Sequence, residues 1–527
     1  MRRRGREALA ARLDQLLRGR VMSTEKALRP FTRDQSIYEI EPMLVAMPAD
    51  VADVQELIAF AAGEGLPLTA RGGGSGTAGS ALGSGLVMVL PHNDSWEAIS
   101  SFNADGTRAR VRAGAGVYHN RLQQYLQQRG YFLPADVSSA EVSCIGGNIA
   151  TKASGPHALR YGSIDRFIDS LEFVTTRGEL VNTADPATIP QRFTEQLAVL
   201  EDRLRADQPA WDFLESRAGM KIASGYNLFA FLEPQPLGQR IARLLAGSVG
   251  TLGLVVSATL QAEAEETGRA AVLLYFDDLA EAARAVSVLR EQVVSAIEVI
   301  SRETVTVLRQ LTELPAGLDV DAHLLLVELT GVTAVAEAQQ AVERLQADRF
   351  RFERSPVVAQ DPERIDALWA LRRQILWLVR HPQPGFRALS VVNDVGIPPE
   401  QLAEFIERVE QVFARHEVVA LIYGHAGSGN LHLRPLFDLT LPDLAGRLQR
   451  LADAVYEEVL RHGGTISAEH GMGRLRAPYL EREWGAALYG YMRELKTIFD
   501  PDDQFNPGVM FSKRPIIEHL RPDLLLY

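Results

Sequence analysis

Cysteine is almost absent from this sequence: Cys144 is the only one in 527 residues. A lone thiol excludes an internal disulfide and cannot ligate an iron–sulfur cluster, so the composition fits a reducing cytoplasm. No apolar run reaches the roughly 20 residues that a membrane-spanning helix needs. The basic residues 1–6 are not followed by the apolar segment of a signal peptide, and a solvated amphipathic helix is expected over residues 6–18. These absences predict a cytoplasmic protein with no transmembrane segment, and they leave peripheral association with the inner membrane open.

Positive charge is also in short supply. The chain has 55 Lys and Arg against 67 Asp and Glu, a formal net charge of −12. Proteins that bind nucleic acids gain much of their affinity by neutralising phosphates, so we expect no general nucleic-acid binding. A hydrophobic content of 46% is ordinary for a globular chain, and this length predicts roughly two to four domains.

Two histidines flank a glycine-rich loop in the second half of the chain. The strand-like residues 418–423 precede His425, and a second strand-like run includes His432. Gly427 and Gly429 permit the positive φ of a chain reversal, so the two strands can form a hairpin. In such a hairpin the two imidazoles can face one another.

This hairpin is a candidate metal site. Asn430, His432 and Arg434 alternate onto one face of the outgoing strand. Two neutral imidazoles are typical ligands of a divalent metal, but such a site needs a third ligand. The glycine-flanked loop at residues 467–473 offers Glu469. A purely structural histidine pair is the alternative.

A second glycine-rich segment lies upstream. The strand-like residues 66–70 run directly into the loop at residues 71–79, which contains three consecutive glycines. Successive N–H groups that no Cβ shields form a nest that binds phosphate oxygens. The spacing matches neither a P-loop nor the G-x-G-x-x-G of a Rossmann fold, so neither is indicated. A flexible surface loop is the alternative.

The two halves of the chain differ in pattern. Helices are expected at residues 49–63 and 117–129 in the first half. From about residue 263, strand-like runs alternate with helical patterns, the latter at residues 278–292, 334–347 and 400–415. This alternation predicts an α+β domain with its helices on one face of the sheet.

Five separate blocks of the chain, the two glycine-rich segments among them, resemble the flavoprotein family of vanillyl-alcohol oxidase and p-cresol methylhydroxylase (PCMH). They are most similar to its FAD-linked D-2-hydroxyacid dehydrogenase branch, from about residue 36 to 510. The resemblance implies an α+β fold: a two-subdomain PCMH-type FAD-binding domain, a substrate (cap) domain with an antiparallel sheet, and a C-terminal segment that returns to the flavin. The expected boundaries are a helical extension at 1–35 and further parts at 36–262, 263–465 and 466–527.

The resemblance implies non-covalent FAD. Family members with covalent flavin often carry a histidine at the position held here by Ser75. The loop from Arg71 to Thr77 would wrap the pyrophosphate, and other segments would line the flavin. The implied FAD contacts are Arg71, Gly72, Gly73, Gly74, Ser75, Gly76, Thr77, Pro134, Asp136, Ser139, Gly146, Gly147, Asn148, Ala150, Ser154, Gly155, Gly253, Val255 and Asn506.

The resemblance also assigns roles at the histidine hairpin. The implied ligands of a divalent metal (Zn, Mn or Fe) are His425, His432 and Glu469. His470 would contact the substrate and act as general base, because an imidazole can take a proton near neutral pH.

The implied reaction is oxidation of a D-2-hydroxy acid, such as D-lactate, glycolate or D-2-hydroxyglutarate, to the 2-oxo acid. The hydroxyl proton would pass to the histidine base and the C2 hydride to flavin N5, with the metal holding the substrate oxygens. Asn430 and Arg372 would contact the substrate carboxylate, although a mid-helix arginine is more often solvated or salt-bridged. The alternatives are a flavin oxidase or alkyl-transferase-like enzyme of the same fold, and a non-catalytic flavin subunit of an electron-transfer complex.

The chain also departs from its relatives. The lysine that some D-2-hydroxyglutarate enzymes carry shortly before a proline is Val392 here, which weakens the case for a dicarboxylate substrate. Charge for a second carboxylate could instead come from Arg373, Arg387 and Arg434.

Longer relatives fuse an iron–sulfur half after this point, whereas this sequence stops at Tyr527 with one cysteine. Electrons are therefore expected to leave through a separate acceptor: an iron–sulfur protein, a quinone, a cytochrome or an electron-transfer flavoprotein. A homodimer stays open. His157 and His462 lie outside the motifs and are expected at the surface.

Overall fold

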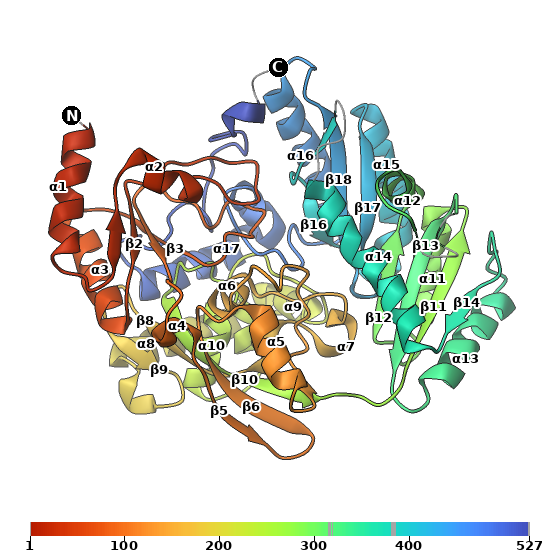
Figure 1. Ribbon diagram of the computed structural model, residues 1–527, viewed down its shortest axis with the longest axis horizontal. Helices are drawn as coiled ribbons and strands as arrows, with labels where there is room; N and C mark the ends of the chain where they lie inside the picture. The colour runs from red at the N-terminus through yellow and green to blue at the C-terminus, as the bar shows by residue number, and fades with distance from the viewer. Residues whose placement is uncertain (1, 315–317, 319, 381–385, 525–527) are drawn as a thin grey trace.

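The computed structural model describes residues 2–314, 318, 320–380 and 386–524. Figure 1 shows two lobes: the elements up to β10, together with helix α17, lie in one, and the elements from β11 to α16 lie in the other. We refer to them as the N-terminal lobe and the cap lobe.

A four-stranded sheet opens the N-terminal lobe, in the order β1 (Arg20–Met22), β2 (Leu44–Met47), β4 (Leu86–Val89), β3 (Leu68–Arg71). Strand β4 pairs in parallel with both β2 and β3, so the chain must cross over between β2 and β3. Helix α3 (Val51–Gly63) makes this crossover and begins where the Asp50 carboxylate accepts two helix N–H groups, which confirms the predicted helix at 49–63. Two other helices, α1 (Arg2–Asp14) and α2 (Glu25–Leu28), precede β2.

The second sheet of this lobe has six strands around β10 (Leu254–Ala264), which pairs with β6, β7 and β8 in antiparallel fashion. Its other strands are β5 (Ile99–Ala104), β6 (Arg108–Gly114), β7 (Tyr131–Phe132), β8 (Ile168–Val174) and β9 (Leu180–Asn182). The helices of this part are α4 (Asp94–Glu97), α5 (His119–Gln127), α6 (Ile145–Thr151), α7 (Ala158–Tyr161), α8 (Gln191–Ala206), α9 (Gln208–Ser216) and α10 (Leu237–Leu245).

The cap lobe is built on an eight-stranded antiparallel sheet. Its order is β14 (Val357–Ala359), β11 (Arg269–Phe276), β13 (His323–Thr330), β12 (Ala296–Ile300), β17 (Val419–His425), β18 (Asn430–Asp438) and β15 (Phe386–Ala388), and β16 (Asn393–Gly396) also pairs with β18. The lobe therefore is α+β with an antiparallel sheet, as predicted.

Helices cover both faces of this sheet, so the prediction of helices on one face alone was wrong. On one side lie α11 (Leu279–Leu289), α13 (Ala334–Ala347), α15 (Leu402–Arg415) and α16 (Leu444–Arg461), and on the other α12 (Arg302–Leu311) and α14 (Pro362–Arg380). Alternate residues of β11 explain this: Val272 and Leu274 belong to the first core, and Leu273 and Tyr275 to the second. The sequence of a strand that is covered on both faces is one apolar run, without the alternation of apolar and polar residues.

The C-terminal segment returns to the N-terminal lobe through α17 (Leu480–Phe499), which lies beside that lobe in Figure 1. Beyond it, Phe505 forms a parallel bridge with Leu68 at the start of β3. The amide of Asn506 is used completely within the protein, because it donates to Ser80 O and Val249 O at 2.8 Å each and accepts from Thr69 Oγ1 at 3.1 Å. Asn506 thus holds three segments of the N-terminal lobe together.

The expectation that His157 and His462 lie at the surface was wrong. His462 is 8% exposed and contacts Glu458 O at the end of α16. His157 lies between the lobes, 2.8 Å from Glu328 Oε1 of the cap and 3.5 Å from Asp136 Oδ2. Neither partner is near His157 in the sequence. In the described part of the chain, no helix has both the length and the apolar character to cross a membrane.

Candidate active site

A cavity of about 430 Å³ lies between the two lobes. Most of the predicted site residues line it: Arg71, Gly72, Gly73, Gly74, Ser75, Gly76, Thr77, Ser139, Gly146, Gly147, Asn148, Ala150, Ser154, Gly155, Gly253, Val255, Arg372, His432, Glu469 and His470. Pro134, Asp136, Asn430, His425 and Asn506 are not part of its wall. Segments that are hundreds of residues apart in the sequence therefore meet around one space.

The upstream glycine loop packs tightly against the segment that precedes α6. A Cβ at Gly73 would collide with Val142 O, and one at Gly72 would lie 2.7 Å from Cys144 Sγ. Gly74 has a φ of +67°, which side chains other than glycine rarely adopt. The three glycines are therefore required by packing and conformation, which a flexible surface loop would not explain.

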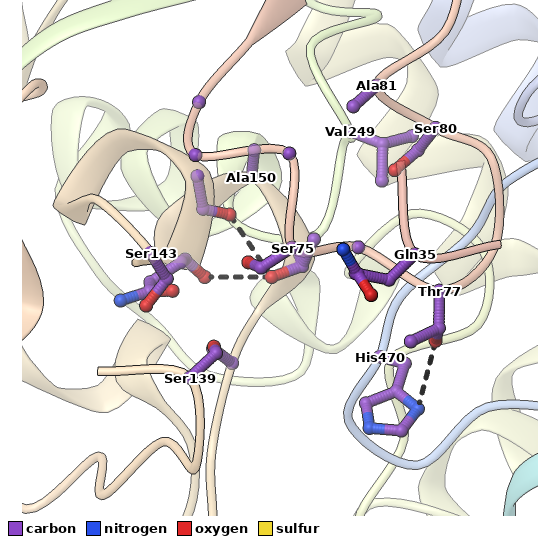
Figure 2. Close-up of a pocket in the computed structure, with 18 of the residues that line it drawn as sticks. Gln35, Ser75, Thr77, Ser80, Ala81, Ser139, Ser143, Ala150, Val249 and His470 are labelled. Carbon is purple, nitrogen blue, oxygen red and sulfur yellow. Dashed lines mark hydrogen bonds between the residues drawn. The ribbon is translucent and has the colours of Figure 1, made fainter. Parts of the chain in front are cut away.

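The end of the glycine loop reaches the histidines of the other motif. Thr77 Oγ1 lies 3.5 Å from His470 Nδ1, and Figure 2 shows these two side chains facing each other across 393 residues of sequence. The His470 and His432 rings stack with their centroids 5.2 Å apart. The candidate phosphate nest and the candidate base consequently belong to one site.

The two histidines of the hairpin face one another, as predicted. Strands β17 and β18 pair Tyr423 with His432, and the His425 and His432 rings lie edge to face at 5.2 Å. Gly429 has a φ of +72° and ends the turn, whereas Gly427 has no positive φ. The local sequence pattern was sufficient to specify this geometry.

Glu469 brings a carboxylate to both imidazoles. Its Oε1 lies 3.1 Å from His425 Nε2 and 3.3 Å from His432 Nε2. Burial lowers the pKa of His432 to about 3, so its ring is neutral. Burial alone would raise the pKa of Glu469, but the charges of Lys221 and His425 hold it well below its ordinary value. Two imidazole nitrogens and an ionised carboxylate form a donor set that could hold a divalent metal.

A buried carboxylate on β12 orients His425. Glu298 Oε1 lies 2.6 Å from His425 Nδ1, and Glu298 Oε2 lies 2.5 Å from Arg372 Nε. Burial opposes ionisation, but the charges of His425 and Arg372 lower the pKa of Glu298 to about 2. Metal-binding histidines commonly have such a carboxylate on their second nitrogen, which fixes the ring and its tautomer.

Asp394 holds the loop that carries Glu469 and His470. Its oxygens accept hydrogen bonds from Glu469 N at 3.1 Å, His470 N at 2.8 Å, Ser467 Oγ at 2.8 Å and Asn430 Nδ2 at 2.9 Å. Asp394 has a φ of +91°, a conformation that costs energy in a residue with a Cβ. Asp394, His432 and His470 also form a close group of potential ligands. The carboxylate of Asp394 is already occupied by four donors, so the group with Glu469 is the better candidate.

The two residues predicted to contact the substrate carboxylate, Arg372 and Asn430, both bind other side chains of the protein. Arg372 is 5% exposed and held by Glu298, so it is buried and salt-bridged, not solvated. Asn430 donates to Asp394 Oδ1 and accepts from Lys221 Nζ at 2.9 Å each. Arg372 still lines the cavity, while Asn430 does not.

His470 is held in a neutral, accepting state. Burial lowers the pKa of His470, and the charges of Asp394 and Glu469 only partly compensate. About a quarter of its side chain (26%) stays exposed, and the residue lines the cavity. A neutral imidazole at a cavity wall can accept a proton from a bound molecule.

Two protein-family models match the chain. A family model described as "FAD binding domain" matches residues 42–184, and one described as "FAD linked oxidases, C-terminal domain" matches residues 266–510. The chain belongs to the FAD-linked oxidase family. The first match lies within the N-terminal lobe, and the second spans the cap lobe and continues through α17 to residue 510.

Individual relatives of this chain are moderately similar to it. The D-2-hydroxyglutarate dehydrogenase of Pantoea ananatis is 27% identical over 502 residues, 90% of this chain and 48% of that protein. The glycolate oxidase subunit GlcD of Bacillus subtilis is 26% identical over 482 residues, covering 90% of each chain. The chain thus spans about half the length of several of its curated relatives.

Solved structures confirm the fold. An alkyldihydroxyacetonephosphate synthase has a TM-score of 0.62 and 17% sequence identity, covering 95% of this chain and 84% of that one.

Several residues of the site were not anticipated from the sequence. Glu298 stands alone in the apolar strand Ala296–Ile300, and Asp394 lies among the apolar neighbours Val392 and Val395. A charged residue inside a buried strand is itself a signal, because its burial is costly without a partner. Lys221 lies in an irregular segment and offered no such signal.

Proposed function

We propose that this protein is an FAD-dependent dehydrogenase that oxidises a D-2-hydroxy acid to the 2-oxo acid. The observation that carries the proposal is the position of His470, which lies 3.5 Å from the end of the glycine loop at Thr77 and stacks on His432 at 5.2 Å. The proposed proton acceptor, two of the three candidate metal ligands and the glycine loop line one cavity. The names of the relatives, D-2-hydroxyglutarate dehydrogenase and glycolate oxidase subunit, support the same class of substrate.

Each residue has a distinct task in this proposal. His470 takes the proton of the substrate hydroxyl, while the C2 hydrogen leaves with its electron pair as a hydride. Bound FAD supplies the two-electron acceptor for that hydride. Asp394 fixes the backbone of the loop that carries the base, and Thr77 and Asn393 stand within 3.5 Å and 3.3 Å of His470 Nδ1.

His425, His432 and Glu469 would hold a divalent metal. The residues fit the role because Glu298 fixes the ring of His425 and because His432 is neutral. A bound metal supplies a Lewis acid for the hydroxyl and carboxylate oxygens of the substrate. Lys221 Nζ, 2.6 Å from Glu469 Oε2, engages one carboxylate oxygen while the other faces the two imidazoles. A non-catalytic flavin subunit would have no use for this complete set.

The direct test is anaerobic mixing of the FAD-loaded protein with D-lactate, glycolate and D-2-hydroxyglutarate. At least one of them is expected to bleach the absorption of the oxidised flavin. Failure of all three would contradict the proposal. Removal of metal with a chelator should slow bleaching and leave FAD bound, and readdition of Zn²⁺ or Mn²⁺ should restore it.

A further inference from the structure

Arg434 is a buried cation of the site that pairs with no acidic side chain. It lies on β18 two residues beyond His432 and is 4% exposed. Its Nη1 donates to Ser390 Oγ, and its Nε has no partner. Among the residues that the structure describes, Arg434 forms no ion pair.

The neighbouring buried cations are compensated. Arg372 has Glu298 at 2.5 Å, and Lys221 has Glu469 at 2.6 Å. Burying a charge without a counter-charge is strongly unfavourable, since the group loses hydration and gains nothing in return. Because the described residues give Arg434 no such counter-charge, its position favours an anion that comes from outside the protein.

Arg434 is part of the cavity wall. Arg434, Ser390, His432 and His470 all line it, and alternation along β18 places Arg434 on the same face of the strand as His432. An anion at this place would lie beside both the candidate metal ligand and the candidate base.

We propose that Arg434 binds a carboxylate of the substrate, and that it is the main charge that recognises the hydroxy acid. This inference rests on the proposed function for the identity of the anion. The planar guanidinium group matches a carboxylate with two parallel hydrogen bonds, which a lysine cannot reproduce. Arg372, whose charge Glu298 already neutralises, then serves to hold Glu298 and shape the cavity wall.

Of the other two arginines that could supply charge, neither is an equal candidate. Arg387 pairs with Asp523 at 3.4 Å, and Arg373 is exposed.

The carboxylate at Arg434 is either the one beside the reacting carbon or one at the far end of a diacid. Both have the same chemistry, and substrates of different length distinguish them.

The test compares the FAD-loaded wild type with Arg434→Met, Arg434→Lys and Arg415→Met, the last replacing an exposed arginine on α15 as a matched control. Anaerobic flavin reduction is followed against the concentration of D-lactate, glycolate and D-2-hydroxyglutarate. Binding of oxamate and of glutarate, which carry no hydroxyl to oxidise, is measured separately from the change in the oxidised flavin spectrum. FAD content and melting temperature report whether each variant folds and holds its cofactor.

Arg434→Met is expected to raise the half-saturating concentration or the carboxylate Kd roughly 30-fold or more. Arg434→Lys should lose less affinity than Arg434→Met, and Arg415→Met should bind the acids as tightly as the wild type. If the affinity falls for all three hydroxy acids, the C1 carboxylate binds at Arg434. If it falls only for D-2-hydroxyglutarate and glutarate, the distal carboxylate binds there.

Three results would overturn the proposal: unchanged binding in Arg434→Met, no carboxylate binding by the wild type in either assay, or loss of FAD as the sole effect of the substitution. The last would mean that Arg434 serves the cofactor. Arg434-dependent binding of oxamate or glutarate in a protein that no hydroxy acid reduces would contradict the proposed function and leave the carboxylate site standing.

Discussion

Glu298 Oε1 lies 2.6 Å from His425 Nδ1, and this contact turns the other nitrogen of the ring toward Glu469. The carboxylate is wholly buried, and its remaining oxygen is held by Arg372. The orientation of His425 therefore depends on a residue 127 positions away that does not line the cavity.

Substitution of Glu298 by Gln should weaken metal binding while leaving the metal ligands in place. The amide keeps the shape of the side chain but loses the charge that polarises the imidazole, and changes of this kind cost about 10–100-fold in affinity. Calorimetric titration of the FAD-loaded protein with Mn²⁺ measures the loss. Glu303→Gln, at an exposed position on α12, serves as control. Equal affinities in the two variants would show that Glu298 has no part in a metal site.

Gly73→Ala should release FAD. The added methyl would collide with Val142 O, and the loop would have to move away from the segment before α6. Overpacking of this kind typically costs about 1–3 kcal/mol. FAD content after gel filtration and the melting temperature report the effect. Gly219→Ala is the matched control, because a Cβ there meets no atom within 4 Å. Normal FAD content in Gly73→Ala would contradict the assignment of this loop.

His157 should make the contact between the lobes sensitive to alkaline pH. Burial alone would lower the pKa of His157, but the hydrogen bonds and charges of Asp136 and Glu328 raise it to about 10. A pKa raised on folding gives stability that is complete below the unfolded value, about 6.5. That stability is lost as the pH rises toward 10. The difference in melting temperature between wild type and His157→Gln should therefore be largest near pH 6 and shrink by pH 10, whereas a difference independent of pH would contradict the ion pair.

The sequence predicted best what is encoded locally. The hairpin of His425 and His432 needed only alternating strand residues and a glycine turn, and α13 occupies the predicted range 334–347. Grouping the hairpin with Glu469 and with the glycine loop needed the family resemblance, because no local pattern says which loops meet.

The remaining partners depend on distant segments. Lys221 reaches Glu469 across 248 residues, and Asp394 reaches His470 across 76. The second helical layer of the cap was missed for a related reason: the apolar run of β11 does not by itself say what covers each face. The isolation of Arg434 could likewise be recognised only once the partners of its neighbours were known.

The most direct test of the account is the rate of anaerobic flavin reduction in His470→Gln against wild type, in one experiment with matched FAD and metal content. The account predicts that the substrate that bleaches the wild-type flavin also reduces the variant, but about 10²–10⁴-fold more slowly, since one proton acceptor is lost. The oxidised spectra should stay similar, because His470 meets the glycine loop at its end, at Thr77. Reduction of the variant at the wild-type rate would show that His470 is not the base and would contradict the account.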